Sequence, residues 1–250
     1  MSTDANPSWS PGRPSIVDGW AAWTRLMQGD AVVLDVREKS RVSGSVHLPW
    51  FEVWDVARAT PVSGIELGYH FARRGIGNGT TCLLLDDGED WRAALVAYVL
   101  VSRGHREVAV VDGGVKAFLR AAADSAETFV AVASRSRGYA ATFVGDETAD
   151  SWVSELEPVP LHVVDEPAGA SRPGRLAWRD LFRSEGRFHP AEIASSVLGA
   201  YAGPFRDRVL QVSSDGGFEW AVVWLVARAL LDVSVRVSGL GGKPGSDERT

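Results

Sequence analysis

Short apolar runs alternate with longer helix-like segments along the first half of the chain. Residues 31–36, 80–85 and 108–111 are mostly apolar, which is typical of strands that are buried on both faces of a sheet. Residues 18–28 and 90–102 have the length and the spacing of apolar side chains expected of helices. Strands that alternate with helices predict an α/β domain with a mainly parallel sheet.

The second half of the chain repeats this alternation. Its pattern predicts strands over 161–164, 209–212 and 233–237, and helices over 150–156 and 219–231. The same order of strands and helices in both halves suggests that the two halves share one architecture.

Four landmarks of the first half recur in the second half in the same order. The pairs are Asp35 with Asp165, Pro49 with Pro173, Asp86 with Ser213, and Gly113 with Gly239. Their separations are 130, 124, 127 and 126 residues. Nearly constant separations indicate an internal duplication, and a repeat of this length is a domain rather than a solenoid unit.

Composition shifts place the boundaries of these two domains. The expected segments are an arm over 1–14, a first domain over 15–120, a linker over 121–137, a second domain over 138–240 and a tail over 241–250. The arm is rich in Ser and Pro, the linker in Ala and Ser, and the tail in Gly and polar residues. Such segments are poor at burying apolar surface, so we expect them to connect or flank the domains.

The overall composition narrows the class of function. A chain of 250 residues with 45% hydrophobic and 23% charged residues is typical of a globular protein. A net charge of −6 disfavours binding to nucleic acid, which needs a basic surface. The longest apolar stretch, 220–227, is too short to span a bilayer. With Cys82 as its single cysteine and no signal-like N-terminus, the chain is expected in the cytoplasm.

Several segments carry a resemblance to a known family. Residues 35–37 and 46–50 are similar to the D-x-R strand end and the G-H-I-P-G turn of rhodaneses, and 85–88 with 111–118 are similar to their Y-D-D-G and L-D-G-G-x-x-A-W signatures. The chain thus resembles a tandem rhodanese, the architecture of thiosulfate and mercaptopyruvate sulfurtransferases. The resemblance implies two rhodanese-like α/β domains, the second of them shortened.

The resemblance also indicates that sulfur transfer is lost. In active members the corresponding strand of the second domain ends in a cysteine, whose thiolate carries sulfur as a persulfide. Here Ser213 stands at that place, and a hydroxyl cannot hold a transferable sulfur. The family's substrate-binding arginines have no counterpart in 166–171, and Asp215 would repel an anionic substrate.

The second-domain loop supplies the candidate site residues, each with a structural alternative. Ser213 is a candidate nucleophile or a plain loop residue, and Asp215 is a candidate general base or a helix N-cap. Ser214, Gly216, Gly217 and Phe218 are expected to bind the ligand, because small residues before a helix can aim N–H groups at an anion. The alternative is an ordinary turn between a strand and a helix.

The first domain is expected to supply the other side of an interdomain cleft. The family places polar groups there, which here are Asp35, Arg37 and Asp55, although Asp35 and Arg37 are also suited to a structural ion pair. Trp50 and Trp54 either shape a pocket for an apolar ligand or cover space left by the shortened second domain. No metal-ligand spacing occurs, and no metal or other cofactor is expected.

Three classes of function follow from these residues. The first is a rhodanese-like protein without sulfurtransferase activity that binds a small polar or anionic molecule in the interdomain cleft. The second is a repurposed enzyme of a specialised biosynthetic pathway that uses Asp215 and Ser213 for acid-base or acyl chemistry. The third is a regulatory or scaffold protein whose cleft is filled by its own side chains. Residual sulfur transfer through Cys82 is a further alternative, which burial in the 80–85 run would oppose.

Overall fold

The computed structural model describes residues 13–39, 42–77, 79–125, 158–166, 169, 171–205 and 208–238. The predicted helix over 150–156, most of the predicted arm and linker, and the predicted tail lie outside the described residues. Arg13, at the end of the predicted arm, donates hydrogen bonds to the carbonyl oxygens of Arg228 and Ala229 and pairs with Asp232.

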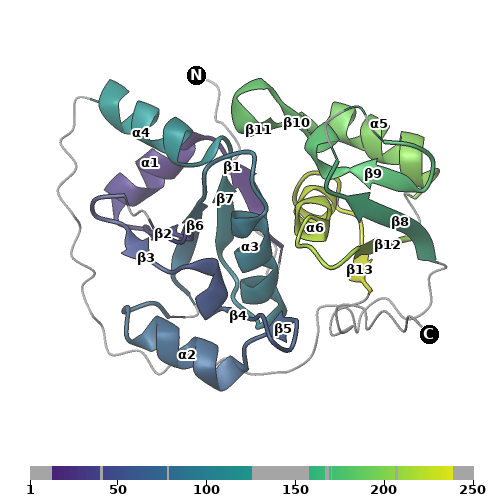
Figure 1. Ribbon diagram of the computed structural model, residues 1–250. Coiled ribbons are helices and arrows are strands. Elements are labelled where there is room, and N and C mark those ends of the chain that lie inside the picture. The colour runs from purple at the N-terminus through teal and green to yellow at the C-terminus, as the bar shows by residue number, and fades with distance from the viewer. Residues whose placement is uncertain are drawn as a thin grey trace.

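The N-terminal lobe alternates strands and helices as predicted. Its elements are β1 (Ser15–Val17), α1 (Gly19–Gln28), β2 (Ala31–Asp35), β3 (Val46–His47), η1 (Trp50–Glu52), β4 (Trp54–Asp55), β5 (Thr60–Pro61), α2 (Gly64–Ala72), β6 (Thr81–Leu85), α3 (Arg92–Ser102), β7 (Val108–Val111) and α4 (Gly114–Asp124). Strands β1-β7-β6-β2-β3 form one parallel sheet in that order. Figure 1 shows α1 and α4 on one face of this sheet and α3 on the other.

Helices cover both faces of the first sheet, which explains why its strands are apolar at nearly every position. In β6, Leu83 and Leu85 belong to the core beneath α1 and α4, whereas Cys82 and Leu84 belong to the core beneath α3. Helix α1 begins where Asp18 accepts a hydrogen bond from the Ala21 N–H, at 2.7 Å, and thereby satisfies a free donor of the first turn.

The C-terminal lobe carries a smaller parallel sheet in the order β13-β12-β8-β9. Its elements are β8 (Pro158–Val164), β9 (Arg175–Ala177), η3 (Trp178–Leu181), β10 (Phe182–Arg183), η4 (Ser184–Gly186), β11 (Arg187–Phe188), α5 (Ala191–Ala202), β12 (Val209–Ser214), α6 (Trp220–Leu230) and β13 (Val235–Val237). The predicted fold class is confirmed: two mainly parallel sheets flanked by helices, with fewer strands described in the second.

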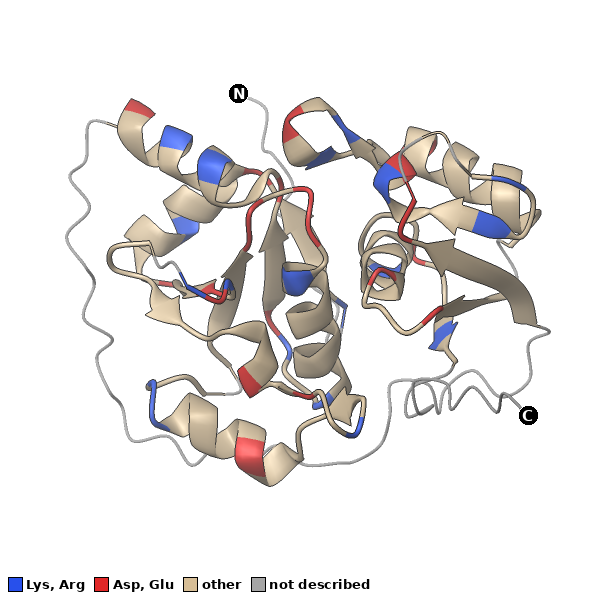
Figure 2. Cartoon of the chain, in the orientation of Figure 1, with Lys and Arg blue, Asp and Glu red and all other residues tan. Residues whose placement is uncertain are grey.

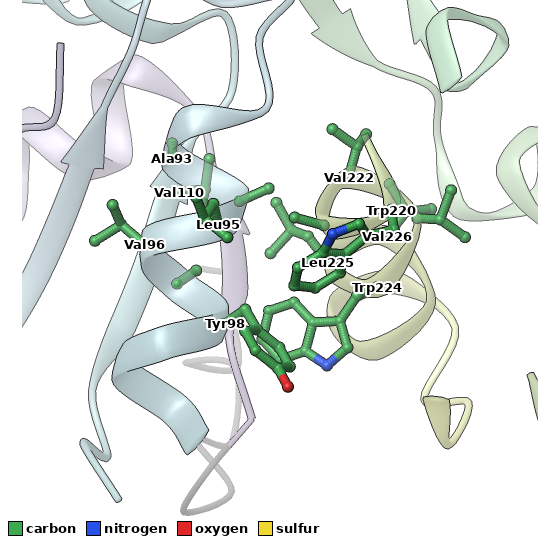
Figure 3. Close-up of a cluster of buried hydrophobic side chains, with 14 of the residues drawn as sticks. Ala93, Leu95, Val96, Tyr98, Val110, Trp220, Val222, Trp224, Leu225 and Val226 are labelled. Atoms are coloured by element: carbon green, nitrogen blue, oxygen red, sulfur yellow. The ribbon is translucent and has the colours of Figure 1, made fainter. Parts of the chain in front are cut away.

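One contact between the two lobes is made by one helix from each. The Tyr98 ring of α3 lies 4.8 Å from the ring of Trp220 and 5.3 Å from that of Trp224, both on α6. Figure 3 shows these side chains facing one another between the two helices. Apolar side chains of both lobes belong to one continuous core that includes this contact. Because it removes large aromatic surfaces from water, this contact should hold the lobes in one arrangement.

The β10–β11 hairpin of the C-terminal lobe makes a second contact between the lobes. The Phe188 N–H donates a 2.7 Å hydrogen bond to Asp112 Oδ1, at the end of β7. Gly186 at the hairpin tip has φ 67°, and a Cβ there would lie 2.7 Å from the backbone nitrogen of Glu89. A residue without a side chain is therefore required for this close approach.

The pairing of strands within each sheet shows which residues of the two lobes occupy the same positions. In the first sheet, Leu34, Leu84 and Val110 are direct partners across three neighbouring strands. In the second sheet, Leu161, Val212 and Val237 form the same kind of row. Leu84 lies eight residues before the first residue of α3, and Val212 eight before that of α6. The rows therefore correspond.

This correspondence differs from the predicted pairing. Counting forward along the matched strands, Asp86 corresponds to Ser214 rather than Ser213, and Asp35 corresponds to His162 rather than Asp165. A shift of one residue matters because neighbouring side chains of a strand point to opposite faces of the sheet.

Candidate functional site

A serine, a histidine and an aspartate lie together at the carboxyl end of the second sheet. His162 Nδ1 lies 3.2 Å from Ser213 Oγ, and His162 Nε2 lies 3.1 Å from Asp215 Oδ1. Ser213 and Asp215 are the catalytic candidates predicted from the sequence. In the structure both contact the imidazole of His162, which was not among the predicted site residues.

The parallel register brings the three side chains together. His162 on β8 and Ser213 on β12 are direct partners across the two strands. The core beneath α6 takes Leu161 and Val212 from the same strands, so the side chains of His162 and Ser213 lie on the opposite face. Asp215 follows the last residue of β12. Strand ends of a parallel sheet are a common place for ligands because loops there leave polar groups exposed.

The three groups can act on a bound molecule in two ways. The imidazole can accept the Ser213 proton at Nδ1 while it donates its Nε2 proton to the Asp215 carboxylate. The roles are those of a Ser-His-Asp arrangement, with the two ring nitrogens exchanged. The same groups also form a set of donors and acceptors suited to hydroxyl or amide ligands. The side chain of His162 is 31% exposed and that of Asp215 is 77% exposed, so solvent reaches the site.

The loop that follows β12 carries acidic groups. The Ser214 hydroxyl donates a 2.9 Å hydrogen bond to the carbonyl oxygen of Gly217. The Glu219 carboxyl folds over Gly217, where an added Cβ would lie 2.0 Å from Glu219 Oε2. Burial raises the pKa of Glu219, and the nearby Asp165 carboxylate adds to this rise. With Asp215 beside it, the loop presents two carboxyl groups, which oppose the predicted binding of an anion.

Phe218 fills the predicted aromatic pocket. Its ring lies 5.2 Å from Trp50, 5.4 Å from Trp54 and 4.7 Å from Trp91, all in the N-terminal lobe. Trp50 and Trp54 therefore pack around an aromatic side chain of the same chain. Phe218, predicted to bind a ligand, is instead part of the contact between the lobes.

The polar residues predicted for the first-domain side do not join the serine site. Asp35 is fully buried, and its carboxylate accepts hydrogen bonds from Arg37 Nε, at 2.9 Å, and from the Val42 N–H, at 2.8 Å. The bond to Asp35 is the main reason that the pKa of Arg37 is raised. Asp55 accepts a hydrogen bond from the Arg58 N–H within the turn after β4. These contacts describe a structural ion pair and a turn.

The equivalent loop of the first lobe is closed by a carboxylate. Asp86 is 3% exposed, and its two oxygens accept hydrogen bonds from the Gly88 N–H, at 2.9 Å, and the Ala93 N–H, at 3.1 Å. Burial raises the pKa of Asp86, and the neighbouring Asp90 raises it further. The N–H groups that a ligand would use in this loop are thus bonded to the protein's own side chain.

Cys82 is poorly placed for chemistry. The residue is fully buried in the middle of the first sheet, and its Sγ lies 3.3 Å from His105 Nε2. Burial strongly raises the pKa of the thiol. A thiol held neutral and away from solvent is a weak nucleophile.

The described part of the chain contains neither a candidate metal site nor a candidate membrane span. Within those residues no group of three His, Cys, Asp or Glu side chains could hold a metal ion. Among the same residues, none of the helices has the length and apolar character needed to cross a membrane.

Comparisons with known proteins agree with the fold. Residues 21–121 match the model of the rhodanese-like domain. A "Putative thiosulfate sulfurtransferase" of Synechococcus elongatus is 35% identical over 109 residues, which are 40% of this chain. The match spans 34% of the length of that curated relative.

Solved structures resemble a larger part of the chain. A structure of EanB with hercynine has a TM-score of 0.68 at 14% identity and covers 93% of this chain and 67% of that chain. The crystal structure of YnjE has a TM-score of 0.66 at 17% identity and covers 91% of this chain and 65% of that chain. At such identities the likeness concerns the fold. Residues 21–121 thus match a rhodanese-like domain, within a chain of two α/β lobes.

Proposed function

We propose that this chain is a rhodanese-like protein that does not transfer sulfur through a persulfide and that binds a small polar molecule in its second lobe. The contact that joins Ser213, His162 and Asp215 carries this proposal. It is an exposed set of hydrogen-bonding groups at the carboxyl ends of two parallel strands, where α/β proteins commonly bind ligands.

The proposal includes a tandem arrangement in which the second unit is degenerate. The matched rows of the two sheets support two rhodanese-like units, over about residues 15–120 and 138–240. In the register of the second sheet, Ser214 takes the place of Asp86 at the strand end. Neither residue has a thiol, so neither loop offers the group on which active relatives carry sulfur.

The charges of the loop favour a polar ligand over an anionic one. Asp215 and Glu219 lie on the loop. Asp165, which pairs with Arg179, is close enough to Glu219 to raise its pKa, and Arg179 lowers it. Thiosulfate and mercaptopyruvate are both anions, so the same carboxyl groups would weaken their binding. A ligand with hydroxyl or amino groups would instead gain hydrogen bonds from the site.

Intact-protein mass spectrometry tests the absence of sulfur transfer. The purified chain is exposed separately to thiosulfate and to mercaptopyruvate, and the gain of one sulfur atom is measured. We expect no gain, because the only thiol is buried. A gain that disappears in Cys82→Ser would contradict the proposal and make Cys82 a sulfur carrier.

NMR of the histidine side chains tests the polar site. The ring nitrogens of His162 are followed while neutral polyols, amino sugars and simple carboxylic acids are added. We expect neutral or cationic compounds to shift the His162 signals and to leave His47 unchanged, because His47 Nε2 is bonded to the Arg37 carbonyl oxygen. Shifts produced only by the acids would contradict the charge argument.

The distance of 3.2 Å between Ser213 Oγ and His162 Nδ1 favours a second candidate function, acyl transfer through a serine nucleophile. A fluorophosphonate probe, which forms a covalent bond with activated serines, tests this candidate. Labelling that is lost in Ser213→Ala and in His162→Ala, but kept in Ser214→Ala, would support it. An unlabelled protein would leave Ser213 as a binding residue.

A further inference from the structure

A cavity of about 160 Å³ lies between the beginning of α4 and the β10–β11 hairpin. We propose that this cavity binds a doubly charged oxyanion, such as the phosphate group of a small metabolite. Its lining residues are Gly113, Lys116, Ala117, Arg120, Glu185 and Arg187. None of them belongs to the site around Ser213, so this is a separate binding site.

The side chains around the cavity carry an excess of positive charge. Lys116, Arg120 and Arg187 are cationic and Glu185 is the one carboxylate among the lining residues, which leaves a net charge of about +2. Arg120 and Glu185 are 3.6 Å apart, and their side chains are 61% and 64% exposed. An ion pair this open contributes little and can exchange its partner for a ligand.

Of the remaining cations, Arg187 is close to the Asp112 carboxylate, whose pKa burial raises and this arginine lowers. Among the residues that the structure describes, Lys116 makes no ion pair. The stem of Arg187 lies against Gly113, with its Cγ 3.4 Å from the position of an added Cβ. In Figure 2, positive residues mark both α4 and the hairpin beside it. A guanidinium and an ammonium group that face one cavity form the kind of site that holds a phosphate group.

The direction of α4 strengthens the attraction. The helix begins at Gly114 without a side-chain cap and with no acidic residue in its first turn. The N-terminal end of a helix carries partial positive charge, to which Lys116 adds a cation. The nearby carboxylate of Asp112 already accepts a hydrogen bond from the Phe188 N–H. A bound oxyanion would offset the positive charge of Lys116 and of the helix end that Asp112 leaves uncompensated.

The size of the cavity limits the ligand. A cavity of about 160 Å³ has room for several water molecules. A phosphate or sulfate group fits this space, whereas a nucleotide would leave most of its atoms outside. Because α4 and the hairpin belong to different lobes, the ligand would also join the lobes.

Binding is tested by backbone amide NMR of the full chain with inorganic phosphate, sulfate and methyl phosphate. We expect the amide signals of Gly113, Lys116 and Arg187 to shift with saturation. Lys116→Ala and Arg187→Ala should each weaken binding about tenfold or more, since each removes a charge-assisted hydrogen bond. Arg106→Ala is the matched control, because Arg106 is exposed just before β7, at the opposite end of the strand from α4.

The outcomes separate the possible ligands and can overturn the site. Tighter binding of methyl phosphate would indicate a phosphomonoester, whereas equal binding of all three probes would indicate a free oxyanion. An absence of shifts at these amides would overturn the proposal. Equal weakening by Arg106→Ala and Lys116→Ala would overturn it as well, because it would show attraction to overall charge. Lys116→Ala removes an exposed side chain, so loss of folding cannot account for its effect.

Discussion

The loops after β6 and β12 occupy equivalent places in the two lobes but are closed in different ways. In the first lobe the buried carboxylate of Asp86 accepts two backbone N–H groups of its own loop. In the second lobe the smaller Ser214 makes one hydrogen bond, to the Gly217 carbonyl oxygen. One architecture thus supports a closed, buried loop and a more exposed loop beside a polar site. The difference lies in side chains, since the strand registers match.

The largest expected effect is on the free energy of unfolding, when Asp86 and Ser214 are each replaced by alanine. Asp86→Ala should lower the free energy of unfolding by about 2–5 kcal/mol, because two buried N–H groups lose their acceptor. Ser214→Ala should cost only about 0.5–1.5 kcal/mol, for one hydrogen bond. Urea unfolding measures both values, and Asp86→Asn, which keeps one acceptor, should fall between them. A greater cost for Ser214→Ala would show that the loops are not equivalent.

A second prediction concerns Phe218, through which the exposed loop contacts the first lobe. Phe218→Ala should reduce stability by about 2–3 kcal/mol, somewhat less than a fully buried phenylalanine, because it leaves a gap among Trp50, Trp54 and Trp91. Phe51→Ala is the matched control at a site 48% exposed and should cost below about 1 kcal/mol. Tryptophan fluorescence and urea unfolding report both variants, and similar costs would argue against an occupied pocket.

A third prediction tests which serine points toward His162. A thiol introduced by Ser213→Cys should have a pKa below the usual value of about 8.5, because the imidazole can stabilise its thiolate. It should react with iodoacetamide about tenfold faster than the thiol of Ser214→Cys, which lies on the face covered by α6. Adding His162→Ala should slow only the Ser213→Cys variant. Equal rates in both single variants would contradict the register described above.

The smallest expected effect is on the pH dependence of stability. Burial raises the pKa of Glu219 above its ordinary value of 4.5, so the folded chain binds this proton more tightly than the unfolded chain. This contribution to stability is complete below pH 4.5 and is lost as pH rises toward the higher pKa of the folded state. Glu219→Gln should therefore flatten the decline of stability in that range.

A series of urea unfolding curves at increasing pH measures this effect. Asp86→Asn should flatten the same decline more strongly, because Asp86 is more deeply buried. A decline that is unchanged in the Glu219→Gln variant would show that its carboxyl is solvated in the folded chain.

The sequence by itself determined the class of fold. The apolar runs of β6 and β7 and the helical spacing before and after them are local patterns, so α3 (Arg92–Ser102) and α6 (Trp220–Leu230) lie close to the predicted 90–102 and 219–231. The resemblance to rhodaneses rested on short motifs and agrees with the match over 21–121. Ser213 could be singled out because the resemblance places it where active rhodaneses carry a cysteine, and Asp215 because it follows a predicted strand.

Tertiary structure alone decided which residues meet. His162 carries no sequence signal for Ser213, which lies 51 residues away, and only the pairing of β8 with β12 places them side by side. The sequence landmarks paired Asp86 with Ser213, whereas the strand register pairs it with Ser214. This error of one residue matters because neighbouring side chains of a strand point to opposite faces of the sheet. Phe218 likewise needed the packing of both lobes to become the occupant of its pocket. Local patterns fix periodicity, whereas contacts between distant strands depend on register and packing.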